Sequence, residues 1–288
     1  MDLLVVLSFE ALKAVASLAL ISVGLAIIFG MMRVINLAHG EFLMLGGYAA
    51  IVATKAGINI WIATLLVSPL VVGLIGVVIE RTIIRFLYGR PRDTMLATWG
   101  LSLLLVGLAT TVFGNTTEGI SAPAGSLQIG DYRIAAYSLI IIVIAIAVFA
   151  AIWAVFRFTR YGLIARSTMQ NADMAAALGV NPSRVYAVTF GVGAGLAGLA
   201  GGVMAPITGI VPTIGAAYVA KAFITVIGGG PAILAGTVSA SVMFGAIDQI
   251  ITYLSTPVIG EVALLVAAVV LLRFMPQGIT GRFFRRAA

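Results

Sequence analysis

A short polar segment between two apolar stretches carries the side chains best suited to binding chemistry. Residues 33–41 read Arg-Val-Ile-Asn-Leu-Ala-His-Gly-Glu. Asn36 is a residue type that caps helices, Gly40 permits close backbone approach, and Glu41 opens an apolar stretch, where a carboxylate complements a helix N-terminus. One interpretation is an interfacial turn with capping residues. The other is a helix break that makes Asn36, His39 and Glu41 residues of a path or gate, because charge at membrane depth is costly.

Further charged side chains lie near or within the apolar stretches, namely Lys55, Glu80, Lys221 and Asp248. We expect Lys55 to extend its ammonium group to the interface, and Glu80 to pair with the adjacent Arg81. Lys221 and Asp248 are expected to face the protein interior or a partner subunit rather than lipid. Together with Thr225, these two residues complete the candidates for a path or gate.

The composition argues against catalysis and metal binding by this chain. It has no Cys and one His, which excludes thiolate and His-rich metal sites, and no nucleophile–base pair is evident. The run 193–198, Gly-Ala-Gly-Leu-Ala-Gly, matches a dinucleotide fingerprint only formally, because no strand precedes it. Its small residues recur four apart and predict close helix packing. We therefore expect no enzyme activity and no bound cofactor.

A second glycine-rich run predicts a helix break rather than a phosphate site. The residues Gly228, Gly229, Gly230 and Pro231 lack the Gly-Lys-Ser/Thr sequence that ends a phosphate-binding loop. Pro231 suits the first turn of a following helix, so the run is expected to end one helix and begin another. Any ATP that the protein uses must therefore bind to another subunit.

The elements that position these residues are a series of apolar segments. The 288 residues are 61% hydrophobic and 9% charged, far fewer charges than a soluble domain carries. The candidate spans are 12–31, 42–56, 60–80, 95–113, 138–157, 185–204, 217–228, 232–254 and 258–275. The segments 42–56 and 217–228 are shorter than a full crossing of about 20 residues, and they predict half-helices or re-entrant segments. The sequence predicts one all-α, polytopic transmembrane helical bundle over 1–288, with about 8–10 spans.

The net charge of +7 is explained by membrane orientation rather than by nucleic-acid binding. Basic residues gather in certain gaps between spans: Arg33; Arg81, Arg85, Arg90 and Arg92; Arg157, Arg160, Arg166 and Arg184; Arg273, Arg282, Arg285 and Arg286. These gaps are predicted to be cytoplasmic. The gap 114–137 holds Glu118 and Asp131 against Arg133 and is predicted to be external. The N-terminus is then outside and the C-terminus inside.

The longest polar stretch, about 158–184, predicts a short cytoplasmic helix. Tyr161-Gly162 is a plausible break, the residues from Ile164 to Leu178 favour helix, and Gly179 is a C-terminal stop. Asn181 and Pro182 then begin the next span. An ordinary surface connector is the alternative, and composition leaves both open.

Several motifs give the chain a family resemblance. INLAHGEFLMLGGYAA (35–50) and GLIARSTMQNADMAAALGVNPSRVYAVTF (162–190) resemble the N-terminal signature and the coupling segment of branched-chain amino acid ABC-importer permeases of the LivH type. AAYVAKAFITVIGGGPAILAGTVSASVMFG (216–245) and FMPQGITGR (274–282) also match their pattern. The resemblance covers nearly the full length. Urea and short-amide permeases share these motifs, so an importer of urea or short amides is an alternative.

The resemblance implies a complex in a bacterial inner membrane. It would contain a homologous second permease, as a heterodimer, two ATPase subunits that bind ATP and Mg, and a periplasmic solute-binding protein. A cytoplasmic helix would couple this chain to an ATPase, and the implied coupling residues are Gly162, Arg166, Asp173, Ala175, Ala176, Ala177, Leu178 and Gly179. Here 175–179 only loosely resembles the Glu-Ala-Ala…Gly loop of other ABC permeases. An ion-coupled secondary transporter is the chief rival, and a channel or membrane enzyme is less favoured.

Overall fold

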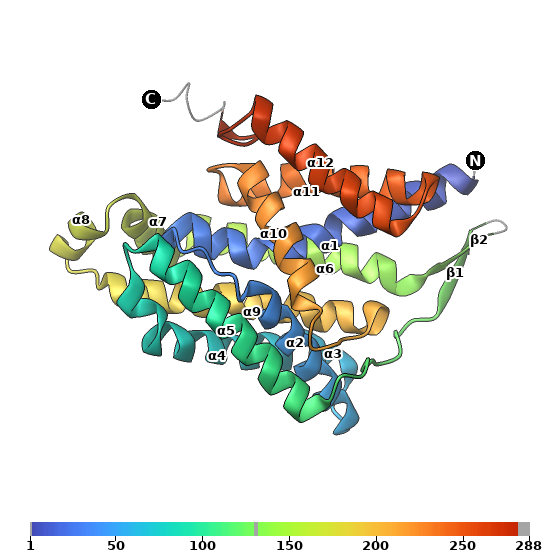
Figure 1. Cartoon of the computed structure of the whole chain (residues 1–288), viewed down its shortest axis with the longest axis horizontal. Coiled ribbons are helices and arrows are strands. Elements are labelled where there is room, and N and C mark those ends of the chain that lie inside the picture. Colours follow the sequence, from blue (N-terminus) through green and yellow to red (C-terminus); the bar gives the residue numbers. More distant parts are fainter. Residues whose placement is uncertain (1, 130–131, 282–288) are drawn as a thin grey trace. The chain divides into compact units, whose positions relative to one another are not determined.

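The computed structural model describes residues 2–129 and 132–281, which are almost entirely helical (Figure 1). Within these residues, seven helical segments are long and apolar enough to cross a membrane: α1 (Asp2–Met32), α3 (Ile60–Ile62) continued by α4 (Ser68–Thr82), α5 (Pro91–Phe113), α6 (Ala136–Phe158), α9 (Pro182–Thr208), α11 (Ile233–Leu254) and α12 (Pro257–Phe274). Two shorter helices, α2 (His39–Lys55) and α10 (Gly215–Gly229), correspond to the two predicted short segments. The prediction of an all-α, polytopic bundle is therefore confirmed.

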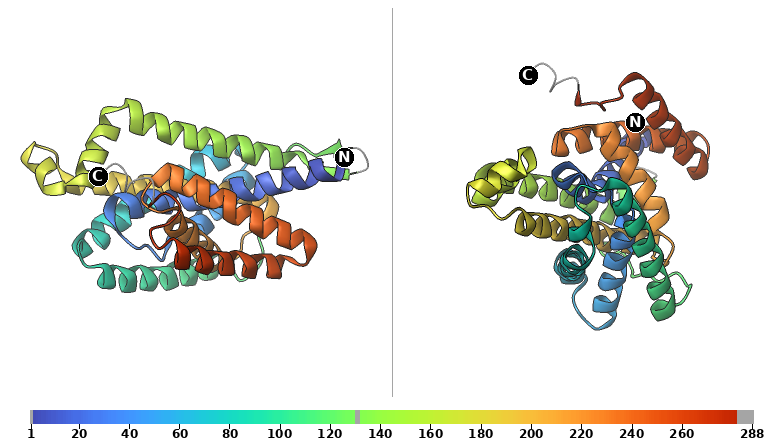
Figure 2. Two further views of the ribbon diagram at one scale, coloured as in Figure 1. Left: turned by 90° about the horizontal axis from the view of Figure 1, so that it is seen from above. Right: turned by 60° about the vertical axis from the view of Figure 1, so that its left-hand side comes forward.

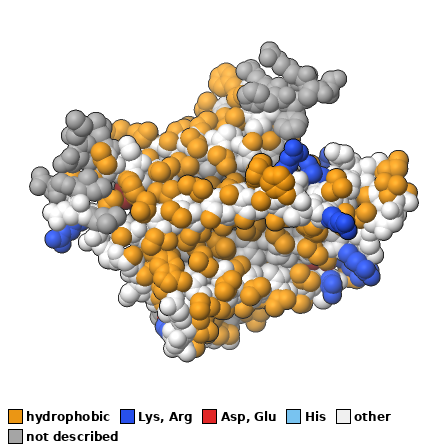
Figure 3. Space-filling view, turned by 180° about the vertical axis from the view of Figure 1, so that it is seen from behind, with side chains coloured by type: hydrophobic (Ala, Val, Ile, Leu, Met, Phe, Trp, Pro, Cys, Tyr) orange, Lys and Arg blue, Asp and Glu red, His pale blue; other side chains and the backbone are white. Residues whose placement is uncertain are grey.

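Hydrophobic side chains dominate the surface, as expected for helices that contact lipid. Figure 3 shows them over most of the visible face, with the Lys and Arg side chains at its margins. Leu74, Val112 and Val269 are typical of the large apolar residues that stay exposed on the long helices. In water such a surface would be unfavourable, whereas in hydrocarbon it costs little.

Contacts divide the chain into two compact units, each assembled from separate stretches. The first unit consists of the described parts of 1–22, 122–149 and 221–288, and the second of 23–121 and 150–220. Helices α1, α6 and α10 each contribute to both units. The single domain predicted for 1–288 remains a prediction.

Helix α9 is the centre of the second unit, where it packs along α2 and α4 (Figures 1 and 2). Its small residues bring the backbones together, as predicted. A Cβ atom added to Gly201 would lie 1.8 Å from the carbonyl oxygen of Leu43 in α2, and one added to Gly195 would lie 2.9 Å from that of Pro69 in α4. A Cβ on Gly193 would lie 2.8 Å from the carbonyl oxygen of Gly24 in α1. The glycines therefore allow three helices to approach α9.

The run from α3 to α4 contains a π-helical turn, Ala63–Val67. Pro69 follows this turn and supplies no backbone N–H to the preceding turn, which lets the helical ladder widen. Ser68 donates its hydroxyl to the carbonyl oxygens of Ala63, at 3.0 Å, and Gly46, at 2.9 Å. The widened turn is thereby tied to α2.

In the first unit, α11 and α12 form an antiparallel pair with an apolar core. Buried Leu18 of α1 packs there with Ala240, Phe244, Leu264 and Ala268. Gly245 allows α1 to approach, because a Cβ there would lie 2.9 Å from the Cα of Val15. This core holds the first part of α1 against the α11–α12 pair.

The gap predicted to be an external loop contains a small antiparallel hairpin, β1 (Ser126–Ile129) and β2 (Tyr132–Ala135). Ser126 pairs with Ala135, and Ile129 with Tyr132. Asp131 of this gap, and the predicted cytoplasmic residues Arg282, Arg285 and Arg286, lie outside the described residues.

The predicted coupling helix is two helices, α7 (Arg160–Gln170) and α8 (Ala172–Ala177), at one end of the long helices of the second unit (Figure 2). The single helix predicted over Ile164–Leu178 is thus wrong. Asn171 adopts extended φ/ψ values and accepts a hydrogen bond from the Met174 amide at 2.9 Å, so its side chain starts a new helix. The predicted break at Tyr161-Gly162 also lies slightly earlier, at Thr159, which caps α7 through the Gly162 amide.

Candidate translocation site

The polar segment that precedes α2 is an irregular loop held by α5. Arg33 ends α1 with a left-handed φ of 52°. The buried Thr98 hydroxyl of α5 accepts from the Leu37 amide at 3.1 Å and lies 3.3 Å from the Ile35 carbonyl oxygen. The loop therefore separates α1 from α2 and lies against α5 at Thr98.

Asn36 shapes this loop but does not cap α2. Its Oδ1 accepts from the Ala38 amide at 3.1 Å, whereas the cap position of α2 is Ala38, which has no side-chain cap bond. The expectation that Asn36 caps the helix is therefore wrong, because the loop turns two residues later. Asn36 is completely buried, and no described residue hydrogen-bonds its Nδ2.

A second irregular segment, 209–214, enters the second unit after α9. Ile210 pairs with Glu118 through backbone bonds of 2.7 and 2.9 Å, and its side chain lies against Gly47. Five residues later, a Cβ on Gly40 would lie 1.9 Å from the carbonyl oxygen of Gly215. Gly40 and Gly47 are about 10 Å apart along α2 at 1.5 Å per residue. The segment therefore runs along α2, from Gly47 to Gly40, before α10 begins.

The N-terminal ends of α2 and α10 therefore meet inside the second unit. Glu41 lies in the first turn of α2 with a 2% exposed side chain, and a Cβ on Gly215 would lie 2.9 Å from its Oε1. Ser102 of α5 interacts with the same carboxylate, while no described residue hydrogen-bonds Oε2. His39 is buried in the same turn. We call Asn36, Glu41, Ser102 and Gly215 the helix-start junction.

The other predicted path residues form a separate cluster in the first unit. Lys221 of α10 donates to Glu261 of α12 at 2.7 Å, and Asp248 of α11 packs against Gly260, with electrostatic contact to Lys221 and Glu261. Thr225 is completely buried and donates to the Lys221 carbonyl oxygen at 2.8 Å. The six candidates thus divide into two groups of three, with Asn36, His39 and Glu41 in the second unit.

Two charged residues have partners that the sequence did not indicate. Glu80, 1% exposed, accepts a hydrogen bond from the hydroxyl of Tyr88, so the expected pair with Arg81 is wrong. Burial and the Glu80 carboxylate raise the pKa of the Tyr88 phenol. Lys55 pairs with Glu118 in the gap predicted to be external.

The α7–α8 segment presents polar and apolar side chains to its surroundings. Arg166 is exposed and donates from Nε to the Gly162 carbonyl oxygen at 3.2 Å. Leu178 is 79% exposed, and Gly179 adopts a φ of 88°, as expected for a helix stop. Asp173, Ala176 and Ala177 are also exposed, whereas Gly162 and Ala175 are buried.

Helix α10 ends within the predicted break at 228–231, and the C-terminal segment is hydrogen-bonded to this end. Helix α10 ends at Gly229, but α11 begins at Ile233, so Pro231 does not lie in its first turn as expected. The Thr280 hydroxyl lies 2.6 Å from the Gly229 carbonyl oxygen, and the Ile279 amide donates to that of Gly228 at 2.8 Å. These bonds satisfy carbonyl groups that the end of α10 leaves unpaired.

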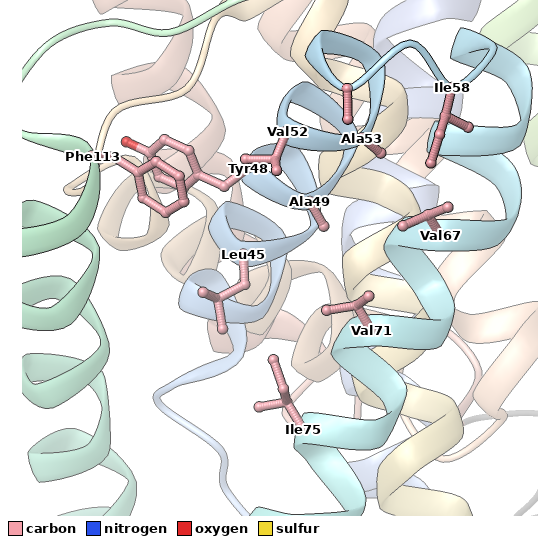
Figure 4. Close-up of a pocket in the computed structure, with 11 residues that line it drawn as sticks. Leu45, Tyr48, Ala49, Val52, Ala53, Ile58, Val67, Val71, Ile75 and Phe113 are labelled. Carbon is pink, nitrogen blue, oxygen red and sulfur yellow. The ribbon is translucent and has the colours of Figure 1, made fainter.

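Two grooves open on the second unit, and both are lined by apolar residues. One, of about 470 Å³, lies between α2, α4 and the end of α5 (Figure 4). Tyr48 and Phe113 stack at its edge with ring centroids 4.0 Å apart. The other, of about 480 Å³, lies between α4 and α9. Neither lining offers a charged side chain, so the candidate binding chemistry remains at the two polar clusters.

Several contributing residues were missed from the sequence, namely Thr98, Ser102, Gly215, Glu261 and Thr280. A hydroxyl residue in an apolar helix and a glycine before one are common, so their types alone give weak signals. Glu261 stands near the start of the last predicted span, as an intramembrane charge that deserved the same attention as Asp248.

Comparison with known proteins decides the family. Residues 8–275 match the family described as "Branched-chain amino acid transport system / permease component". The chain belongs to this family. This permease is 28% identical to the high-affinity branched-chain amino acid transport system permease protein LivH of Salmonella typhimurium, over 95% of this chain and 94% of that protein. It is 29% identical to LivH of Escherichia coli K12 with the same coverage.

A further relative and one solved structure add to this comparison. The permease is 26% identical to the permease protein BraD of Pseudomonas aeruginosa, over 92% of this chain and 91% of that protein. Among solved structures, PsaBC from Streptococcus pneumoniae in complex with Fab matches with a TM-score of 0.50 and 14% identity, covering 97% of this chain and 94% of that one. This structural match concerns the fold alone. From its family and its apolar helices, the chain is a multi-pass membrane permease with a transport role.

Proposed function

We propose that this chain is the permease subunit of an ATP-driven importer of branched-chain amino acids in a bacterial inner membrane. The observation that carries the proposal is the family match over residues 8–275, together with relatives that align over more than nine-tenths of both chains. Those relatives are named as branched-chain amino acid permeases. The permease itself would carry out no covalent chemistry.

The proposed complex contains a homologous second permease, forming a heterodimer, two ATPase subunits and a periplasmic solute-binding protein. ATP and Mg bind to the ATPase subunits, since the sequence contains no phosphate-binding loop. The two permeases together enclose the path. ATP binding and solute delivery then shift the populations of inward-open and outward-open states.

The coupling contact with the ATPase is assigned to α7 and α8, from Gly162 to Gly179. Exposed apolar Leu178 and charged Arg166 and Asp173 suit a protein partner better than lipid. The buried Ala175 and Gly162 pack the segment against its own unit, so that a push on α8 would be passed to the long helices.

In the proposed orientation, the N-terminus is outside and the C-terminus is in the cytoplasm. In the second unit, Met31 contacts Thr189, Tyr161 contacts the same Thr189, and Tyr88 contacts Tyr186. The gaps rich in arginine therefore converge at one end of this unit, which the positive-inside rule assigns to the cytoplasm. The Lys55–Glu118 pair then lies outside.

The path is assigned to the broken helices. Asn36, His39 and Glu41 precede or begin α2, and Lys221, Thr225 and Asp248 lie on α10 and α11. Polar groups beside irregular backbone are tolerated at membrane depth only where protein or water surrounds them, which is the setting of transporter binding sites.

The complex can be tested by gentle purification of the tagged permease and identification of co-purifying proteins, followed by reconstitution with candidate binding proteins. We expect an ATPase partner and ATP hydrolysis stimulated by binding protein loaded with leucine, and not by one loaded with urea. Absence of an ATPase partner, or uptake driven by an ion gradient without ATP, would contradict the proposal.

The coupling assignment is tested by Arg166→Glu. We expect uptake to fall while the permease still inserts, because the substitution reverses the charge of the proposed ATPase contact. Arg92→Glu is the matched control, since Arg92 is exposed near the same end of the unit but lies outside α7 and α8. Wild-type uptake in the Arg166 variant would remove this assignment.

A further inference from the structure

The helix-start junction contains a buried donor and a buried acceptor that the described residues leave unsatisfied. They are Nδ2 of Asn36, whose side chain is 0% exposed, and Oε2 of Glu41, which is 2% exposed. An unpaired buried polar group is costly, so folded proteins rarely keep such groups without a reason. One of these atoms is a hydrogen-bond donor and the other is a carboxyl oxygen that can accept.

Two helix N-termini supply the opposite electrostatic character at the same place. Helix α2 begins at His39 without a side-chain cap, and α10 begins at Gly215. A Cβ on Gly215 would lie 2.7 Å from the carbonyl carbon of Gly40 and 2.9 Å from the amide nitrogen of Glu41. The first amide groups of a helix lack intrahelical acceptors and carry partial positive charge, which favours an anion.

The Glu41 carboxyl group already lies at this position. Its Oε1 is the oxygen that would lie 2.9 Å from a Cβ on Gly215, at the start of α10. A ligand carboxylate could replace it there, and the displaced Glu41 would then be available to a positive group. The junction therefore suits a ligand that carries both charges close together.

We propose that the helix-start junction binds the head group of an α-amino acid, with the α-carboxylate at the start of α10 beside Asn36 Nδ2 and the α-ammonium at Glu41. The inference rests on the proposed function and adds to it the residues that would bind the part of the substrate common to all α-amino acids. The zwitterion is common to all α-amino acids, so the site recognises the class and leaves the side chain to apolar walls. Urea and uncharged amides lack both charges and are poor ligands for it.

Access to the site requires the two helix starts to separate, because both polar side chains are buried. The starts of α2 and α10 are in direct backbone contact at Gly40 and Gly215, because a Cβ on Gly40 would lie only 1.9 Å from the Gly215 carbonyl oxygen. Exchange of Glu41 for the substrate carboxylate at α10 would weaken that closure. Binding and opening are then linked, since a ligand shifts an equilibrium by its differential affinity for the two states.

The test substitutes Glu41→Gln in the complete complex, reconstituted in liposomes with its binding protein and leucine as the probe. Glutamine keeps the shape and removes the charge that would pair with the ammonium. We expect leucine uptake to fall about tenfold or more, as for a lost charged contact, while leucine-loaded binding protein still stimulates ATP hydrolysis. Glu80→Gln is the matched control, because it neutralises another buried carboxylate of the same unit, and it should retain uptake.

A second measurement does not depend on transport. The sequence has no Cys, so Leu37→Cys places one thiol on a half-buried residue next to Asn36. We expect leucine to slow the alkylation of this thiol by an uncharged maleimide, and urea to leave the rate unchanged. Adding Glu41→Gln should abolish protection by leucine.

The outcomes separate this inference from the proposed function. If the wild-type complex imports no amino acid, the proposed function fails. If it imports leucine but Glu41→Gln imports at the wild-type rate, or urea protects the introduced thiol as well as leucine does, only the inference is overturned. A fall in uptake and ATP hydrolysis together, with leucine protection retained, would assign Glu41 a structural role and also overturn it.

Discussion

Single buried hydrogen bonds hold the polar residues of this permease in place, because the bilayer offers no water to replace them. The Tyr88 hydroxyl satisfies Glu80 near the end of α4, and Thr98 satisfies the Leu37 amide before α2. In each case the two partners are more than one helical turn apart in the sequence. Loss of one partner therefore leaves a buried group unpaired rather than solvated.

Tyr88→Phe is expected to destabilise the permease by about 1–3 kcal/mol, because the Glu80 carboxylate loses its donor while the ring is retained. A lowered melting temperature in detergent, followed by size-exclusion chromatography, would show this. Tyr253→Phe is the control, since Tyr253 is exposed. Equal melting temperatures for the two variants would mean that the Tyr88–Glu80 bond contributes nothing.

The same bond predicts a response to alkaline pH. The folded state raises the pKa of Tyr88 above its ordinary value near 10, so folding favours the protonated phenol. Its contribution is complete below about pH 10 and is lost as the pH rises through the folded pKa. The difference in stability between wild type and Tyr88→Phe should therefore shrink only at strongly alkaline pH.

At the scale of elements, close backbone contacts decide how the helices of the second unit pack. Helix α9 contacts α1, α2 and α4 through different glycines, and α2 adds Gly46, where a Cβ would lie 2.1 Å from the Gly198 carbonyl oxygen. Lipid provides no hydrophobic driving force between helices, so van der Waals contact over closely packed backbones is what holds them.

Gly201→Ala is expected to impair folding, because the new Cβ would lie 1.8 Å from the Leu43 carbonyl oxygen and must push α2 away from α9. Such overpacking costs about 1–3 kcal/mol or more. The yield of monodisperse protein after extraction should fall sharply. Gly107→Ala is the matched control, since nothing lies within 4 Å of its Cβ position on α5. A normal yield for Gly201→Ala would refute the packing argument.

At the scale of the whole molecule, the chain passes more than once between its two compact units. Helix α10 begins at the helix-start junction in the second unit and continues into the first, where Thr280 of the C-terminal segment is hydrogen-bonded to its last residue. Helix α10 thus links the junction covalently to the cluster of Lys221, Asp248 and Glu261. The short helix α10, with an irregular segment before and after it, therefore connects the two polar clusters.

The orientation of the molecule can be tested with single cysteines, since the sequence has none. Thr116→Cys in the proposed external gap should react with a membrane-impermeant maleimide in intact cells. Gln170→Cys at the end of α7 should react only after permeabilisation, although both positions are exposed. The reverse pattern would invert the proposed topology.

The membrane-spanning helical class, the nine apolar segments, the two short helices and the breaks near 33–41 and 228–231 could all be predicted from the amino-acid sequence. These depend on local composition and on where glycine, proline and charge interrupt hydrophobic runs. The resemblance also indicated the family, which the comparisons confirmed.

Which polar residues lie close together depends on how the helices pack, and the sequence did not predict it. Glu41 meets Gly215 across more than 170 residues of sequence, Glu80 turns to Tyr88 instead of its neighbour Arg81, and Asn171 splits the coupling segment in two. Apolar helices in lipid carry no polar stripe that would reveal their facing partners, so backbone contacts between distant glycines set the register. The helix-start junction exists because the break near 33–41, which the sequence predicts, packs against the start of α10 at Gly215, which the sequence did not indicate.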